Sequence, residues 1–182
     1  MSRRDDIADA GVGLIARAGI RALTHRAVDS AALLPGGSTS YYARTHRELV
    51  ALVVERLAEY TQEDLDNFEI PAGLAELDVV ALASGFLDLL ARREDAQAVR
   101  FALLFELRGD PELRAMLTAD APVRGNLIEA ASGVLAAIGV KEPMVHAPDF
   151  VGLIDALLMY RTSGAAVIDA PEVLGAYLRG IR

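Results

Sequence analysis

Most of the side chains that could bind a partner lie between residues 24 and 47. Three hydroxyl residues, Ser38, Thr39 and Ser40, are followed directly by Tyr41 and Tyr42. Hydroxyl groups, phenols and free backbone N–H groups at a helix start can all bond phosphate oxygens or base edges. Positive charge stands on both sides, at Arg26, Arg44, His46 and Arg47. The combination predicts contact with a nucleic acid duplex.

Two helices must precede this segment to position it. Apolar and small residues recur at i, i+4, i+7, i+8 and i+11 from Ile7 to Ala18, which predicts a helix about 15 residues long. Gly19 follows at the place where a helix commonly ends. The Thr24 hydroxyl can then cap a short second helix over residues 25–32.

A tight turn at residues 33–37, which contains one proline and two glycines, separates the second helix from the third. We expect the third helix to begin near Ser38 and to end at Tyr42 or Ala43. Two short helices joined in this way can lay one of them into the major groove of DNA. We expect one of the two tyrosines to pack in the core.

A fourth helix is predicted over residues 46–65. Thr45 and Glu48 have the spacing of a capping box, and an apolar stripe follows them as far as Tyr60. A proline and glycine then break the pattern, so we place the domain boundary between Asn67 and Gly73.

The net charge of −8 argues, for the whole chain, against a partner as acidic as nucleic acid. The charge is unevenly distributed, however. Residues 1–49 contain seven arginines and five acids, a net charge of +2, and the remaining 133 residues contain 11 basic and 21 acidic residues, a net charge of −10. This asymmetry suggests a segment that tolerates a polyanion and a larger one that repels it, although sampling noise would also give so small an excess.

Residues 24–49, THRAVDSAALLPGGSTSYYARTHREL, resemble the helix-turn-helix of the tetracycline-repressor (TetR) family of bacterial transcriptional regulators. The similarity extends over roughly residues 7–60, about a third of the chain. The positions that match the family pattern are Thr24, Val28, Ala32, Gly37, Tyr41, Tyr42, His46 and Leu49.

The chain departs from the family pattern at five positions. Asp29 replaces an alanine, Leu33 a turn glycine, Ser40 a tyrosine, Ala43 a phenylalanine and His46 a lysine. A leucine in the turn predicts that φ is not positive there, or that Gly36 and Gly37 take over the role of the glycine. A histidine in place of lysine makes a phosphate contact that strengthens as the pH falls.

The resemblance implies an all-α protein with three parts: a helix-turn-helix DNA-binding domain (1–48), a connecting helix (49–70) and a helical-bundle domain for effector binding and dimerisation (71–182). It implies a homodimer on a double-stranded, pseudo-palindromic operator and a ligand-responsive repressor as the function. The residues expected to contact DNA are Thr24, Arg26, Gly37, Ser38, Thr39, Ser40, Tyr41, Tyr42, Arg44 and His46.

Helical patterns continue through the rest of the chain, over residues 74–93, 95–108, 111–118, 121–138, 149–163 and 171–181. Pro111, Pro122, Pro148 and Pro171 lie at or near the starts of segments, where a missing N–H costs nothing. Segments 121–138 and 149–163 carry small residues that permit close helix approach. The family resemblance implies that these two segments form the dimer interface.

The run FALLFEL at residues 101–107 predicts a helix that is buried nearly all round or lines a cavity. An unidentified small apolar or amphipathic effector would bind there. The candidate ligand-binding residues are Phe86, Leu90, Phe101, Leu104, Phe105 and Met116. The alternative is that these six residues are ordinary core.

No catalytic, metal or cofactor site is expected. Cysteine is absent, and His25, His46 and His146 lack metal-ligand spacing. No apolar run approaches the ~18 residues of a membrane span, so we expect a cytoplasmic protein. The competing hypothesis is a helical ligand-binding or scaffold protein whose degenerate helix-turn-helix no longer binds DNA, which Asp29, Ala43 and His46 favour.

Overall fold

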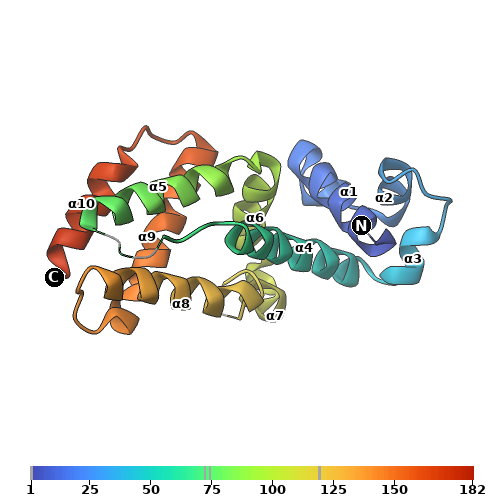
Figure 1. Ribbon diagram of the computed structural model, residues 1–182. Helices are drawn as coiled ribbons and strands as arrows, with labels where there is room; N and C mark the ends of the chain where they lie inside the picture. The colour runs from blue at the N-terminus through green and yellow to red at the C-terminus, as the bar shows by residue number, and fades with distance from the viewer. Residues whose placement is uncertain (1, 72, 74, 119) are drawn as a thin grey trace. The chain divides into compact units, whose positions relative to one another are not determined.

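The computed structural model describes residues 2–71, 73, 75–118 and 120–182, and this part of the chain contains helices and no strands (Figure 1). The N-terminal α-helices are α1 (Arg3–Ala18), α2 (His25–Ala31), α3 (Ser38–Tyr42) and α4 (His46–Asp66). The later ones are α5 (Glu76–Ala91), α6 (Glu94–Glu106), α7 (Pro111–Ala115), α8 (Pro122–Ala137), α9 (Pro143–Ser163) and α10 (Ala170–Gly180). Two 3-10 turns, η1 (Ile20–Ala22) and η2 (Leu107–Gly109), follow α1 and α6. The prediction of an all-α fold is confirmed.

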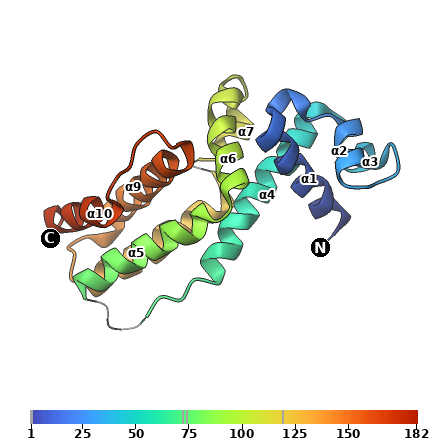
Figure 2. The ribbon, with the colours of Figure 1, turned by 90° about the horizontal axis from the view of Figure 1, so that it is seen from above.

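The chain packs as two compact units. The first comprises Met1–Tyr60 and Glu94–Ala121, and the second comprises Thr61–Arg93 and Pro122–Arg182. In the first unit, α1 packs on both α2 and α6, and α2 packs on α3. In the second unit, α8 packs on α9, while α5 packs on α9 and α10 (Figure 2).

Side-chain caps set the helix starts that the sequence predicts in the first unit. The Thr24 hydroxyl accepts a hydrogen bond from the Ala27 N–H at the start of α2. Thr45 and Glu48 form the predicted reciprocal pair at the start of α4, since Thr45 Oγ1 accepts from Glu48 N and Glu48 Oε2 accepts from Thr45 N. Gly19, with φ 75°, ends α1.

The turn between α2 and α3 differs from the prediction at its first residue. Leu33 itself adopts the left-handed conformation, with φ 55°. The Leu34 N–H donates to the Asp29 carbonyl and the Leu33 N–H to the Ser30 carbonyl, the two bonds of a Schellman motif. The turn therefore keeps the geometry that usually requires glycine, while Gly37, with φ 90°, provides a second left-handed residue before α3.

The buried faces of α1 and α4 form the core of the first unit, together with inward-facing residues of α2 and α6. The fully buried side chains include Ile7, Leu23, Val28, Leu49, Val53 and Leu103. Gly11 allows α1 to approach α4 closely, because a Cβ built on it would lie 2.7 Å from Val53 Cγ2.

Two predictions about the later helices need correction. Helix α9 begins at Pro143 rather than at residue 149, so Pro148 lies inside a helix and not at its start. The helix of residues 101–107 is not buried all round, because Leu103 and Leu107 face the core while Phe105 on the other side is 71% exposed. Residue 74, the predicted start of the fifth helix, lies outside the described residues. None of the described helices is long and apolar enough to span a membrane.

Candidate nucleic-acid interface

Helix α3 has an inner face and an outer face. Thr39 and Ala43, one turn apart, are both fully buried. Ser40, Tyr41 and Tyr42 are exposed, Tyr41 to 85% and Tyr42 to 38%. The prediction that one tyrosine is a core residue is wrong, because the small residues at 39 and 43 occupy the positions that face inward.

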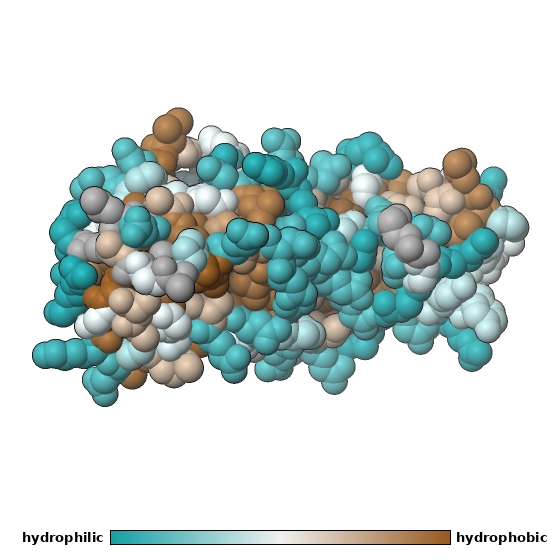
Figure 3. All heavy atoms as spheres, viewed as in Figure 1, coloured by the Kyte–Doolittle hydropathy of each residue, from teal (hydrophilic) through white to brown (hydrophobic). Residues whose placement is uncertain are grey.

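The two tyrosine rings contact each other edge to face, with centroids 5.3 Å apart. Such a pair restricts both rings while leaving their outer edges and hydroxyl groups accessible. Hydrophobic atoms also reach the surface over α2 and the turn that follows it (Figure 3), where Leu33 is 92% exposed.

The sequence predicts that backbone N–H groups at the start of α3 are free to bind phosphate, but the structure shows that they have acceptors within the protein. Asp29 on α2 is 4% exposed, and its carboxylate accepts from the N–H groups of Gly37 and Thr39, each at 2.7 Å. The Ser38 N–H donates to the Pro35 carbonyl. The N–H groups of Gly37, Ser38 and Thr39 are therefore already bonded within the protein.

Three of the residues assigned to DNA contact thus have structural roles. Thr39 is buried and donates its hydroxyl to Asp29 Oδ1 at 2.6 Å, so we remove it from the proposed contact set. Gly37 contributes its left-handed conformation, and its N–H is used by Asp29. The Ser38 hydroxyl donates to the Pro35 carbonyl at 2.6 Å, although Ser38 is only half-buried.

Burial by itself raises the pKa of the Asp29 carboxyl, but the hydrogen bonds from Thr39 and Gly37 outweigh this effect. The pKa is therefore held below its ordinary value, and Asp29 is ionised at neutral pH. A buried negative charge at the N-terminus of α3 is also favoured by the helix dipole.

The C-terminal end of α3 also has a partner on α2. Nε2 of His25, half-buried on α2, lies 2.8 Å from the Ala43 carbonyl oxygen. Because a carbonyl only accepts, Nε2 is the protonated nitrogen of this ring.

The polar and cationic residues that flank α3 differ in whether their side chains have ion-pair partners within the protein. Thr24, Arg26, Arg44 and His46 are exposed, and the guanidinium groups of Arg26 and Arg44 have no ion-pair partner within the described part of the chain. Arg47, in contrast, binds Asp110 and Glu112, with Nη2 2.7 Å from Glu112 Oε2.

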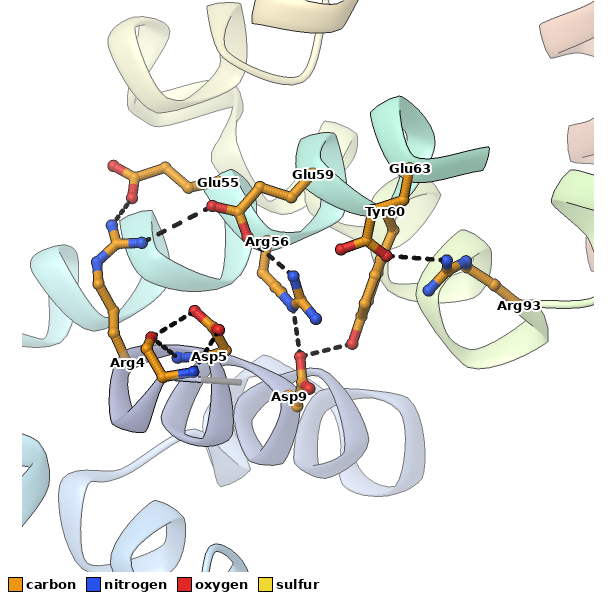
Figure 4. A network of polar contacts seen from close by, with 10 residues as sticks. Arg4, Asp5, Asp9, Glu55, Arg56, Glu59, Tyr60, Glu63 and Arg93 are labelled. Atoms are coloured by element: carbon orange, nitrogen blue, oxygen red, sulfur yellow. Dashed lines mark hydrogen bonds and ion pairs between the residues drawn. The ribbon is translucent and has the colours of Figure 1, made fainter. Parts of the chain in front are cut away.

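A network of polar contacts joins α1 to α4 in the first unit (Figure 4). Arg56 Nε donates to Asp9 Oδ1 at 2.7 Å, and the Tyr60 hydroxyl donates to the same oxygen at 2.6 Å. Arg4 binds Glu55. Burial alone would lower the pKa of Arg56, but its hydrogen bonds to Asp9 and Glu59 raise it above the ordinary value.

Helix α4 continues into the second unit, where Arg93 binds Glu63 (Figure 4). Arg93 also binds Asp64. Asp64 is buried, and Arg93 Nε lies 3.1 Å from each of its carboxylate oxygens. This pair ties the end of α4 to the segment that follows α5.

The six predicted ligand-binding residues fall into both units. Phe86 and Leu90, on α5, are buried in the second unit, and Phe86 contacts Phe68 with ring centroids 5.0 Å apart. The other four belong to the first unit, where Leu104 and Met116 pack against its core. Neither unit by itself assembles the predicted pocket wall, and Phe105 is exposed.

No group of three or more His, Asp or Glu side chains that could hold a metal ion occurs among the residues that the structure describes.

Sequence reasoning missed two functional relationships around α3. From the sequence, His25 is notable only as a histidine without metal-ligand spacing, and Asp29 only as a departure from the family pattern. Their i, i+4 spacing, which places both side chains on one face of α2, is the signal that could have paired them with the two ends of α3.

Comparison with known families shows a match over the C-terminal part of the chain. Residues 75–182 match the family described as tetracyclin repressor-like, C-terminal domain. This segment makes up more than half of the chain. No curated protein matches the chain.

Several solved structures share the fold. A transcriptional regulator from Rhodococcus sp. Rha1 is 20% identical, with a TM-score of 0.77 over 99% of this chain and 96% of that one. A TetR-family member from Streptomyces coelicolor A3 is 21% identical, with a TM-score of 0.69 over 100% and 98%. The multidrug binding protein EbrR, complexed with imidazole, is 19% identical, with a TM-score of 0.64 over 100% and 95%. At these identities the likeness concerns the fold alone.

Proposed function

This chain belongs to the tetracyclin repressor-like family of transcriptional regulators, and we propose that it binds a pseudo-palindromic operator as a homodimer and represses transcription until an effector binds. The helix-turn-helix domain would be residues 1–48, the connecting helix 49–70 and the effector and dimerisation domain 71–182. We expect the protein to act in the cytoplasm.

The observation that carries the proposal is the outer face of α3. A five-residue helix presents Ser40, Tyr41 and Tyr42 to solvent while Thr39 and Ala43 fill the core beneath it. The hydroxyl groups and rings of these exposed tyrosines suit contacts with phosphates, sugars and base edges. We propose that this face enters the major groove.

The positively charged phosphate contacts would come from outside α3. Thr24 and Arg26 lie in or just before the first turn of α2, and Arg44 and His46 lie between α3 and the first turn of α4. Because Arg26 and Arg44 are exposed and form no ion pair with any residue that the structure describes, they keep their charge available for a polyanion.

Small residues on α8 and α9 support the dimer. A Cβ added to Gly133 or Gly152 would meet nothing within 4 Å, and Ala136 and Ala156 are exposed. A second copy of these two helices could therefore approach closely and form a four-helix interface around a two-fold axis.

The effector would act by binding preferentially to the state that fits DNA poorly. A similar fold in EbrR, a multidrug binding protein found with imidazole, supports a small apolar or amphipathic effector. Phe86 and Leu90, both buried on α5, are the proposed pocket residues of the second unit.

A salt titration tests the DNA part of the proposal. Fluorescence anisotropy should show that the protein binds a random-sequence duplex at low salt, with log affinity falling linearly with log salt concentration. Arg26→Ala and Arg44→Ala should each reduce the slope by about 1 for every phosphate contact removed. Arg92→Ala, which changes an exposed arginine of the second unit, is the matched control and should leave the slope unchanged.

Absence of binding at low salt would instead favour the scaffold hypothesis. One of the departures behind that hypothesis has a structural explanation, since Asp29 forms hydrogen bonds to the start of α3.

A further inference from the structure

Helix α3 is too short to hold its own conformation. It has five residues, and isolated helices shorter than ~12–15 residues are marginal in water. Its N-cap residue is Gly37, which has no side chain to cap the free N–H groups. The geometry of α3 must therefore come from its contacts with the rest of the unit.

Asp29 supplies the missing cap from another helix. Its Oδ2 accepts from the Gly37 N–H, and its Oδ1 accepts from both the N–H and the hydroxyl of Thr39, at distances of 2.6 to 2.7 Å. Asp29 is 4% exposed and Thr39 is fully buried, so water competes little for these bonds.

His25 fixes the opposite end of the same helix. It lies four residues before Asp29 on α2, and its Nε2 donates to the carbonyl oxygen of Ala43, the C-cap of α3, at 2.8 Å. Ala43 is fully buried. One face of α2 thus holds both ends of α3, with a carboxylate at the positive end of the helix and an N–H donor at the C-cap on the negative end.

We propose that His25 and Asp29 are positioning residues that set the sequence discrimination of this protein by fixing α3, rather than by contacting DNA. This inference rests on the proposed function. The base-reading side chains, Ser40, Tyr41 and Tyr42, depend on where α3 lies. The cationic side chains proposed to bind phosphate, Arg26 and Arg44, do not belong to α3, so general attraction to DNA survives when the two ends of α3 are released.

The test compares two duplexes, one enriched by the wild-type protein from a randomised pool and one scrambled version of it. Asp29→Ala should lower the ratio of the two affinities by about tenfold or more, a loss comparable with that of a base contact. The affinity of Asp29→Ala for the scrambled duplex should stay close to the affinity of the control variant Asp6→Asn for the same duplex. Asp6 lies in the first turn of α1 and forms no side-chain hydrogen bond or ion pair within the described residues, and its substitution removes the same negative charge.

Conservative substitutions separate positioning from general stability. Gln at position 25 keeps an N–H donor for the Ala43 carbonyl, so His25→Gln should retain most of the ratio that His25→Ala loses. Asn at position 29 keeps one acceptor oxygen, so Asp29→Asn should fall between wild type and Asp29→Ala. Circular dichroism establishes that each variant is folded, and Asp29→Asn replaces Asp29→Ala in the comparison if the alanine variant is not.

The possible failures are distinguishable. A wild-type protein that enriches no sequence overturns the proposed function. If the wild-type protein does enrich a sequence but folded position-29 variants keep the full affinity ratio, the positioning inference alone is overturned. Equal losses on both duplexes, or equal losses in His25→Gln and His25→Ala, also overturn it.

Discussion

The guanidinium of Arg47, in the first turn of α4, binds the carboxylate of Asp110 through two parallel hydrogen bonds, Nε to Oδ2 at 2.6 Å and Nη2 to Oδ1 at 3.0 Å. Asp110 is also the N-cap of α7, where its Oδ1 accepts from the Leu113 N–H. The hydrogen bond between the two side chains raises the pKa of Arg47 and lowers that of Asp110. One carboxylate therefore joins the start of α4 to the start of α7.

Substitutions at Asp110 should separate its two roles. Asp110→Asn loses the charge but keeps an oxygen that can cap α7, so it should lower the melting temperature less than Asp110→Ala does. Arg47→Ala should resemble Asp110→Asn. Thermal unfolding at low salt and at about 1 M salt checks the charge part, because screening should shrink the difference between Arg47→Ala and wild type. A difference that persists unchanged at high salt would show that the ion pair is not its cause.

Leu33 should be replaceable by glycine with a gain in stability. A non-glycine residue in the left-handed region costs roughly 1–2 kcal/mol, and the Leu33 side chain is 92% exposed, so it returns little burial energy. Allowing for the greater chain entropy of glycine, Leu33→Gly should raise the free energy of unfolding by about 0.5–1 kcal/mol. Leu33→Ala, which keeps the strain, should not. Urea denaturation measures both.

A reciprocal variant exists at the end of α8. The same Schellman turn occurs there, with Val140 N–H donating to the Leu135 carbonyl and Gly139 at φ 78°. Gly139→Leu should therefore destabilise the protein by about 1–2 kcal/mol. If Leu33→Gly proves no more stable than Leu33→Ala, the left-handed leucine carries a benefit that its exposure does not explain.

Gly11 and Gly13 form a matched pair on α1. A Cβ at Gly11 would lie 2.7 Å from Cγ2 of Val53, a fully buried side chain, whereas at Gly13 it would meet only the flexible end of Arg17, at 3.1 Å. Gly11→Ala should therefore destabilise the protein by about 1–3 kcal/mol through overpacking. Gly13→Ala should stabilise it by up to about 1 kcal/mol through helix propensity. Equal effects in urea denaturation would mean that α1 and α4 are not closely packed at Gly11.

Local signals in the sequence predicted the N-terminal helices well, because their caps lie within three residues of the groups they bind. Thr24 and Thr45 each define a helix start in this way. The role of Asp29 is not local, since its partners lie eight and ten residues further along the chain, beyond the turn. No periodicity or cap pattern covers such a distance.

The remaining differences come from packing that competes with local preference. The Leu33 conformation is maintained by hydrogen bonds at the end of α2, which outweigh the cost of a positive φ. The apolar run 101–107 suggested burial on all sides, but a helix on one edge of a core buries only one stripe, and Phe105 lies outside it. In α9, Pro148 is tolerated inside the helix although it forfeits a backbone hydrogen bond.

Tyr60 should ionise only at high pH. Partial burial and the hydrogen bond to Asp9 raise the pKa of its phenol to about 12. A raised pKa in the folded state means that the protonated phenol contributes stability, fully below the ordinary value near 10, and that this contribution is lost as the pH rises towards about 12. Tyr60→Phe removes the hydroxyl and should cost about 1 kcal/mol near neutral pH.

Ultraviolet difference spectra, wild type minus Tyr60→Phe, isolate this phenol from the four other tyrosines. The phenolate band in the difference spectrum should develop near pH 12 in the native protein and near pH 10 when both proteins are unfolded in denaturant. Urea titrations at rising pH supply the second measurement, because the stability difference between the two proteins should shrink above pH ~10. A native transition near 10 would mean that Asp9 does not hold the Tyr60 hydroxyl in solution, and that the α1–α4 network relies on Arg56 instead.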